Sequence, residues 1–367
     1  MSLDQIAAAF DRQDYNVAAR LLREFLQASP QNPWGQVYKA RLYEVSDNLE
    51  GATAIYQHLL KNVTHPKIVS HARQGLQRIE AKLLLQRQQA IEQAKSEPEN
   101  IEPGLLILEA IAPEARSQAA KDFARILNLD IYTARLQLPN RGWRIYRLGA
   151  IGELSFYSQH LKAANISSFC TTESDLKQIP VFEVMHFIDY VPQVVLVCQN
   201  EQGQLGSMTF DWSEISQRVQ GQLPIFERVI DSSIRQGVQR QRKEKTQDYV
   251  QVCDLHLPKR RCILRLCDWR YQFEQGIEFG AMGDQTIELD QSINRLHWNS
   301  LLNFLNEQML GKKAWSDFTT FGETAIEFPV LLDRLPAQIY PYGQDETLWS
   351  AAFQLYSSLA FIRSSDR

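Results

Sequence analysis

Along residues 1–95 the apolar positions recur at helical spacing, and two segments are alike at an offset of 34 residues. Between DYNVAARLLREFLQASP and NLEGATAIYQHLLKNVTHP, the matching pairs are Asp14-Tyr15 with Asn48-Leu49, Ala18 with Ala52, Leu22 with Tyr56, and Phe25 with Leu59. A small alanine fits where two antiparallel helices cross closely, and the larger residue one turn further along fills the space beside the crossing. The pattern therefore predicts paired antiparallel helices that repeat along the chain.

A third helical segment is predicted after Pro66. Its apolar stripe passes through Ala72, Leu76 and Ile79 and continues into AKLLLQRQQAIEQAK. A helical-repeat array needs such a closing helix, because its last unit otherwise leaves an apolar face uncovered. We therefore expect residues 1–95 to form one helical-repeat domain with a long final helix.

These positions resemble the tetratricopeptide repeat (TPR), most closely in the second unit, whereas the first helix of the first unit departs from the family pattern. The resemblance implies a module without catalytic activity that binds a protein partner in a concave groove lined by the first helix of each unit. The implied groove positions are Trp34, Val37, Arg41, Glu44, Arg73 and Gln77. An alternative interpretation is that Trp34 and Val37 pack in the core and that the charged residues form a solvated face. Leu3 and Ala7 stand where family members that hold a C-terminal carboxylate carry lysine and asparagine, so binding of such tails is not implied.

The pattern changes at KSEPENIEP, a polar stretch with two prolines that predicts a linker over residues 96–104. Beyond it, the apolar runs LLILEAI, WRIYRL and SSFCTT predict strands, and the segments between them predict helices. The order β-α-β-α-β predicts an α/β domain over residues 105–222, with a ferredoxin-like fold as the candidate arrangement.

Residues 223–367 are predicted to form an α+β domain. We expect a helix over residues 225–245, followed by YVQVCDLHL and RCILRLCDWRYQF, whose alternating apolar and polar residues are typical of half-buried antiparallel strands. WNSLLNFLNEQML and TLWSAAFQLYSSLAFI predict closing helices. The predicted fold class is therefore a helical repeat followed by mixed α/β and α+β regions.

The composition is that of a folded globular protein: 44% of the 367 residues are hydrophobic, 22% are charged, and the formal net charge is −4. No apolar run approaches the roughly 20 residues that span a bilayer, and MSLDQIAAAFDRQDY lacks the features of a secretory signal. The five cysteines are scattered and odd in number, which favours a reducing, cytoplasmic location. In its glutamine-rich character the chain resembles bacterial repeat proteins.

One segment, residues 234–270, is rich in basic residues. A nucleic-acid-binding interpretation assigns an anion-binding patch to Arg240, Arg242, Lys243, Lys259, Arg260 and Arg261, with nearby aromatic rings as stacking surfaces. We favour instead a solvated helix end and the outer face of a sheet, because in CILRLCDWRYQF the arginines alternate with apolar residues.

No motif predicts catalysis. Cys253, His256, Cys262 and Cys267 lie near one another in sequence, but they fall within predicted strands and lack the paired two-to-four-residue spacing of structural zinc sites. We therefore predict no catalytic residue, no metal and no cofactor. The leading hypothesis is an adaptor or assembly factor that binds a protein partner through its repeat. The alternatives are a nucleic-acid-associated regulator that uses the basic segment, and an enzyme whose site residues converge only in the folded chain.

Overall fold

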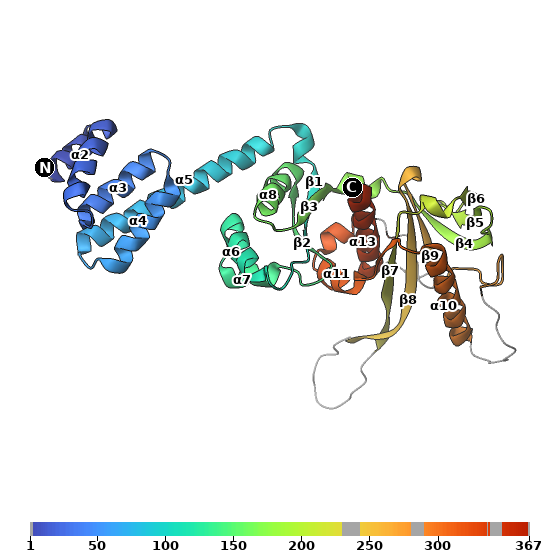
Figure 1. The fold of residues 1–367 in the computed structure, drawn as a ribbon. Coiled ribbons are helices and arrows are strands. Elements are labelled where there is room, and N and C mark those ends of the chain that lie inside the picture. The colour runs from blue at the N-terminus through green and yellow to red at the C-terminus, as the bar shows by residue number, and fades with distance from the viewer. Residues whose placement is uncertain (1–2, 230–242, 280–289, 336, 338–346, 366–367) are drawn as a thin grey trace, which may run out of the picture. The chain divides into compact units, whose positions relative to one another are not determined.

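The computed structural model describes residues 3–229, 243–279, 290–335, 337 and 347–365 (Figure 1). The chain divides into two compact units, Met1–Ala94 and Lys95–Arg367. The first is helical and the second combines helices with two β-sheets. The predicted order of a helical region followed by an α+β region is confirmed. None of the helices in the described ranges combines the length and the apolarity needed to cross a membrane.

The first unit consists of helices that run in antiparallel pairs, followed by one long helix. These are α1 (Leu3–Asp11), α2 (Tyr15–Ala28), α3 (Pro33–Val45), α4 (Leu49–Asn62) and α5 (Pro66–Ala94). Proline stands at the first position of α3 and of α5, where its fixed φ suits a helix start and its missing N–H costs no hydrogen bond.

The 34-residue period is visible in the turns that join the paired helices. Gln13 and Asp47, one period apart, both adopt a left-handed backbone, with φ values of 58° and 62°. The next residues, Asp14 and Asn48, each cap the following helix by accepting a hydrogen bond from the backbone N–H three residues on, at 3.2 and 3.0 Å. The first unit is therefore a helical repeat in its turn geometry as well as in its sequence.

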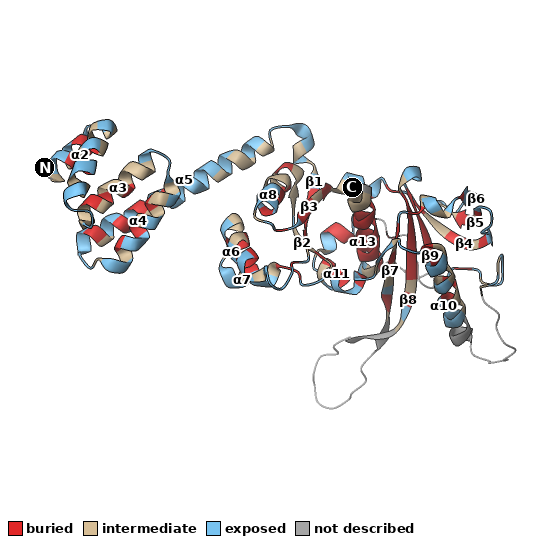
Figure 2. Ribbon diagram, in the orientation of Figure 1, coloured by how far each residue is buried: buried red, intermediate tan, exposed pale blue. Residues whose placement is uncertain are grey.

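The repeat positions also occupy equivalent places in the core. Ala18 and Ala52 are both fully buried, and Leu22 and Tyr56 lie beside them with exposed fractions of 3% and 0%. In α5 the buried residues all lie in the first half of the helix, and Figure 2 shows the second half as mostly exposed. The predicted closing helix is thus present, but only its first half covers the repeat.

The second unit begins with a three-stranded antiparallel sheet in the order β2-β1-β3. Its strands are β1 (Pro103–Glu109), β2 (Trp143–Ala150) and β3 (Ser168–Thr172). The accompanying helices are α6 (Arg116–Leu127), α7 (Ile131–Gln137), α8 (Ile151–Ala163) and α9 (Glu173–Lys177). The central strand β1 is antiparallel to both neighbours. In the described chain this sheet lacks the fourth strand of a ferredoxin-like fold, so the order of elements was predicted but the arrangement differs.

The second sheet has seven strands in the order β10-β7-β8-β9-β4-β5-β6. The bounds are β4 (Val181–Asp189), β5 (Val194–Gln199), β6 (Leu205–Phe210), β7 (Gln217–Val229), β8 (Lys243–Leu257), β9 (Cys262–Cys267) and β10 (Lys313–Trp315). Strand β7 crosses the predicted boundary between residues 222 and 223, so both predicted segments of the second unit contribute strands to one sheet.

The helix expected over residues 225–245 is wrong in its described parts. Residues 225–229 end β7 and residues 243–245 begin β8, and these two strands pair with each other; the residues between them lie outside the described ranges. Intrinsic helix propensity is a weak preference, and the ladder that continues from the buried part of the two strands overrides it.

The closing helices are α10 (Asp290–Gln308), α11 (Phe318–Ala325), α12 (Pro329–Leu332) and α13 (Leu348–Ser365); short 3-10 turns cover Pro98–Ile101, Trp212–Glu214 and Pro258–Arg260. Every residue of α13 from Ala351 to Phe361 is buried, because one apolar core joins this helix to both sheets. A separate core packs α10 against strands β4, β5, β8 and β9. Figure 2 shows α13 as the most completely buried helix of the drawing. A helix that is largely apolar on all sides is expected to be buried in this way; the buried polar exceptions in α13 are Ser350, Gln354, Ser357 and Ser358.

Candidate functional site

The first helix of each pair contributes aromatic and cationic side chains to neighbouring positions in the repeat. The rings of Phe10 and Tyr38 lie 5.2 Å apart, which brings α1 beside α3. The rings of Trp34 and His71 lie 5.3 Å apart, edge to face, which brings α3 beside α5. The Arg41 guanidinium lies 4.9 Å from the centre of the Phe10 ring. The helices α1, α3 and α5 therefore form one continuous side of the first unit.

Two of the implied groove residues have structural partners. Val37 is only 2% exposed and belongs to the core. Glu44 accepts a short hydrogen bond from the Tyr56 hydroxyl and two from Arg78, at 3.0 and 2.8 Å. Burial and this bond raise the pKa of the Tyr56 hydroxyl. Glu44 and Arg78 are one period of 34 residues apart, and opposite charges at that offset were the sequence signal that could have identified Arg78.

The other two residues on α5 point away from this side. The packed face of α5 consists of Ile68, Ala72, Gly75 and Ile79. Arg73 and Gln77 are exposed, and each stands two residues from Gly75, which rotates it by about 160° around the helix. His71 and Arg78 take the positions next to α3 instead. The structure therefore does not bring Arg73 and Gln77 together with Trp34 and Arg41.

What remains accessible on α1 and α3 is a mixed aromatic and charged surface. Trp34, Tyr38 and Arg41 are all half-buried. Burial raises the pKa of Tyr38. The charge of Arg41 opposes this rise, and the charges of Asp11 and Asp4 add to it, so all three influence the Tyr38 hydroxyl. We call Trp34, Tyr38 and Arg41, with Asp4 and Asp11, the repeat face. Half-buried aromatic rings and arginine are the side chains most often found at the centre of protein interfaces.

Of the predicted anion-binding patch, the structure describes the side chains of Lys259, Arg260 and Arg261, and a carboxylate holds one of them. Arg260 makes two hydrogen bonds to the Glu214 carboxylate, at 2.8 and 3.0 Å, and this pair lowers the pKa of Glu214 to about 2. Lys259 and Arg261 are exposed. Arg240 and Arg242 lie outside the described residues, as does the side chain of Lys243.

The expected solvated outer face of strand β9 is wrong. Both faces of β9 are buried, and Arg265 is 1% exposed. Its guanidinium makes two hydrogen bonds to Asp254 of β8, at 2.8 and 2.7 Å, and lies 5.2 Å from the centre of the Phe353 ring in α13. The alternation in CILRLCDWRYQF correctly predicted a strand over Cys262–Cys267, but the strand ends there, and α13 covers the side that the pattern assigned to solvent.

The cysteines and the histidine of the same region are distributed among different packing environments. Cys253 and Cys262 belong to the core under α10, whereas Cys267 belongs to the core around α13. Burial lowers the pKa of His256 to about 4. Its ring nitrogens contact Gln217 at 2.9 Å and Ser357 at 3.0 Å. Within the described residues, no three His, Cys, Asp or Glu side chains are grouped so as to hold a metal ion.

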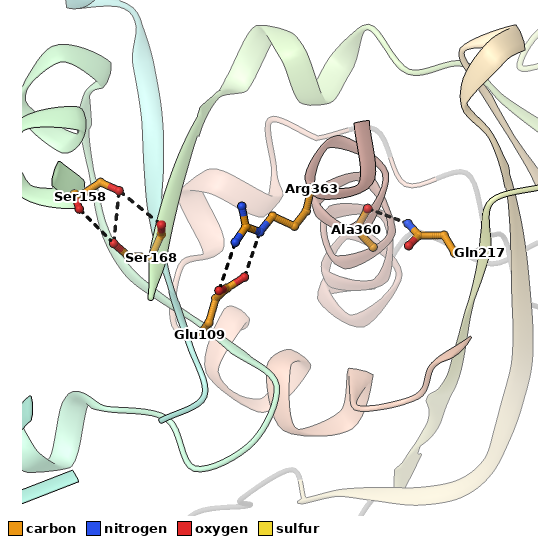
Figure 3. A network of polar contacts seen from close by, with 6 residues as sticks. All are labelled: Glu109, Ser158, Ser168, Gln217, Ala360 and Arg363. Carbon is orange, nitrogen blue, oxygen red and sulfur yellow. Dashed lines mark hydrogen bonds and ion pairs between the residues drawn. The ribbon is translucent and has the colours of Figure 1, made fainter. Parts of the chain in front are cut away.

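Polar contacts fix the buried helix α13 to both sheets (Figure 3). The Gln217 side chain of β7 donates to the Ala360 carbonyl oxygen at 2.7 Å. At the end of the helix, Arg363 donates twice to Glu109 of β1, at 3.0 and 3.3 Å. These groups hold elements in place, and their hydrogen-bonding capacity is directed at the protein itself.

The geometry thus defines a helical-repeat unit joined to an α+β unit with two sheets on one central helix. No family model matches the chain, and no curated protein or solved structure matches it significantly. The repeat face is the surface that the sequence pattern, the repeat geometry and the side-chain chemistry single out together.

Proposed function

We propose that the protein is a non-enzymatic adaptor or assembly factor, whose first unit is a TPR-like module that docks a protein partner on the repeat face. The observation that carries this proposal is the 34-residue period, which appears in the sequence and again in the φ values and caps of the two turns. Such stacked helix pairs present an extended surface to one partner. In this proposal the α+β unit binds a second partner, so that the protein connects the two.

The chemistry of the repeat face supports a partner that offers both an apolar and an anionic group. Trp34 and Tyr38 supply ring surface, and the guanidinium of Arg41 lies over the Phe10 ring. Asp4 and Asp11 stand on the same side, so a cationic group beside the anionic one would also be accommodated. A helix or an extended segment with mixed charge fits this description. The proposal includes a reducing, cytoplasmic setting, because all five thiols are free.

The nucleic-acid-associated function is not proposed, because within the predicted patch Arg260 is engaged by Glu214, and elsewhere in the basic segment Arg265 is buried against Asp254. Salt-dependent nucleic-acid binding relies on lysine and arginine side chains that are available to neutralise phosphates.

The test is affinity capture from native lysate with the full chain, with Arg41→Glu, and with the matched charge reversal Arg20→Glu on the exposed side of α2. We expect the wild-type chain and Arg20→Glu to recover the same partner, and Arg41→Glu to recover about tenfold less, which corresponds to roughly 1.4 kcal/mol. Thermal unfolding should show that the first unit of each variant remains folded. Equal recovery by a chain that begins at Ile101 would refute the assignment to the repeat.

A further inference from the structure

A crevice in the second unit lies where strands β8 and β9 meet helix α10. Its volume is about 440 Å³. The lining residues come from β8, from the loop that follows β9, and from α10: Asp248, Tyr249, Asp268, Trp269, Asn294, Arg295, Leu296 and Asn299. None of these side chains contributes to the repeat face, which belongs to the other unit.

The charges in the crevice do not balance. Arg295 contacts one oxygen of Asp248 at 3.3 Å, and both side chains of this pair are partly exposed. Asp268 Oδ1 is enclosed, and it accepts no hydrogen bond from any residue that the structure describes. Two carboxylates therefore face one guanidinium among the lining residues. A partly buried carboxylate that shares one guanidinium with a second carboxylate is incompletely compensated, and a bound cation would reduce that cost.

The remaining lining residues identify the kind of cation. Tyr249 is 45% exposed, and Trp269 is half-buried; ring faces attract organic cations and also cover their alkyl chains. The amides of Asn294 and Asn299 add oxygen acceptors. Metal ions such as Mg²⁺ and Ca²⁺ prefer six or more oxygen ligands, many of them carboxylates, and aromatic walls do not supply these.

We propose that this crevice binds a small organic cation of the alkylammonium type. The ammonium group of the ligand pairs with Asp268 and is also attracted by the nearby carboxylate of Asp248. The alkyl chain of the ligand lies against the rings of Tyr249 and Trp269. A free diamine and the side chain of a lysine in a peptide share this chemistry. The proposal goes beyond the adaptor function and does not depend on it.

The proposal has a definite pH dependence. The pKa of Asp268 is raised to about 7, chiefly by burial and further by the charge of Asp248. Hydrogen bonds from the backbone amides of Gln251 and Trp269 and the charge of Arg295 act in the opposite direction. An alkylammonium ligand stays protonated throughout this range, so only the fraction of ionised Asp268 controls binding. That fraction rises about tenfold between pH 6 and pH 8, and the apparent affinity rises in the same proportion.

Isothermal titration calorimetry of the full chain tests this site with two probes, putrescine and the Nα-acetyl amide of lysine. We expect saturable one-to-one binding of at least one probe. Stronger binding of putrescine identifies a free amine as the natural ligand, and stronger binding of the lysine amide identifies a peptide side chain. The expected dissociation constant falls about tenfold from pH 6 to pH 8.

The decisive variant is Asp268→Asn, which keeps the side-chain shape and removes the charge. We expect it to weaken binding at pH 8 by at least tenfold and to abolish the pH dependence, whereas Asp333→Asn, at an exposed residue just after α12, changes neither. Far-UV circular dichroism establishes that both variants are folded. The proposal is overturned if neither probe binds, if Asp268→Asn binds as tightly as the wild type, or if Mg²⁺ or Ca²⁺ displaces the amine at equal concentration.

Discussion

Removing the carboxylate of Asp254 should lower the free energy of unfolding of the Lys95–Arg367 unit by about 3–5 kcal/mol, because Arg265 is left buried without its counter-charge. The two side chains are 0% and 1% exposed and share two hydrogen bonds of 2.8 and 2.7 Å. Arg265 Nη1 already lacks an acceptor in the described part of the chain. In Asp254→Ala the whole guanidinium would therefore be desolvated without compensation.

The same reasoning predicts a different result when both partners are replaced. The attraction within a buried ion pair largely offsets the cost of removing two charges from water, so its net contribution to stability is small. Asp254→Leu combined with Arg265→Met fills a similar volume between β8, β9 and α13 with apolar groups. We expect the free energy of unfolding of the double variant to be within about 1 kcal/mol of the wild-type value, or higher than it.

Urea unfolding followed by tryptophan fluorescence measures both effects, because Trp34 is the only one of the seven tryptophans outside the second unit. A loss of this size also lowers the melting temperature by roughly 10 °C. If Asp254→Ala lowers the free energy of unfolding by less than about 1 kcal/mol, water must reach the Arg265 guanidinium. A double variant as unstable as Asp254→Ala would show that the pair itself stabilises the fold, and the reasoning from desolvation would be wrong.

Two further predictions concern buried groups in the two units. Gly75→Ala should destabilise the first unit by about 1–2 kcal/mol in thermal unfolding, because the added Cβ would lie 2.3 Å from the Tyr56 ring; Gln77→Ala, on the opposite side of α5, should be neutral. His256 has a folded pKa of about 4, below its unfolded value of 6.5, so its unfolded form binds the proton first and stability is lost as pH falls from 6.5 towards 4, by on the order of 3 kcal/mol. His256→Gln should lose less stability than the wild type over this window; an identical loss in both chains would contradict the assignment. Asp268 titrates with the opposite sign, since its raised pKa makes stability fall as pH rises from 3.8 through 7, so the comparison is cleanest in an Asp268→Asn background.

The helical repeat could be predicted because its information is local and occurs twice. Ala18 and Ala52 were matched by sequence alone, and both proved to be fully buried. The turn residues at the same offset share their backbone conformation. The predicted groove residues on α3 followed from this pattern, since Trp34 and Arg41 lie on the repeat face. The predicted groove residues on α5 did not. Whether Arg73 or Arg78 points toward α3 depends on the rotation of α5 about its axis, and packing against Tyr56 sets that rotation.

The second unit was harder to predict because its contacts join residues that are distant in sequence. The crevice of the proposed amine site combines residues 248–249 with 268–269 and 294–299, and no spacing along the chain marks such a set. The raised pKa of Asp268 arises from its burial there, and the sequence shows only an aspartate after a strand.

By itself, the sequence determined where most helices and strands occur, the helical repeat, and the change of fold class after residue 95. These depend on periodicity and on capping, turn and proline residues, whose effects extend over a few neighbouring positions. Only the tertiary structure decided that residues 225–229 and 243–245 are strands, that Arg265 is buried, and that α13 lies between two sheets. Strand pairing and the covering of a sheet face depend on which distant segments meet, and the local pattern of apolar and polar residues does not encode that choice.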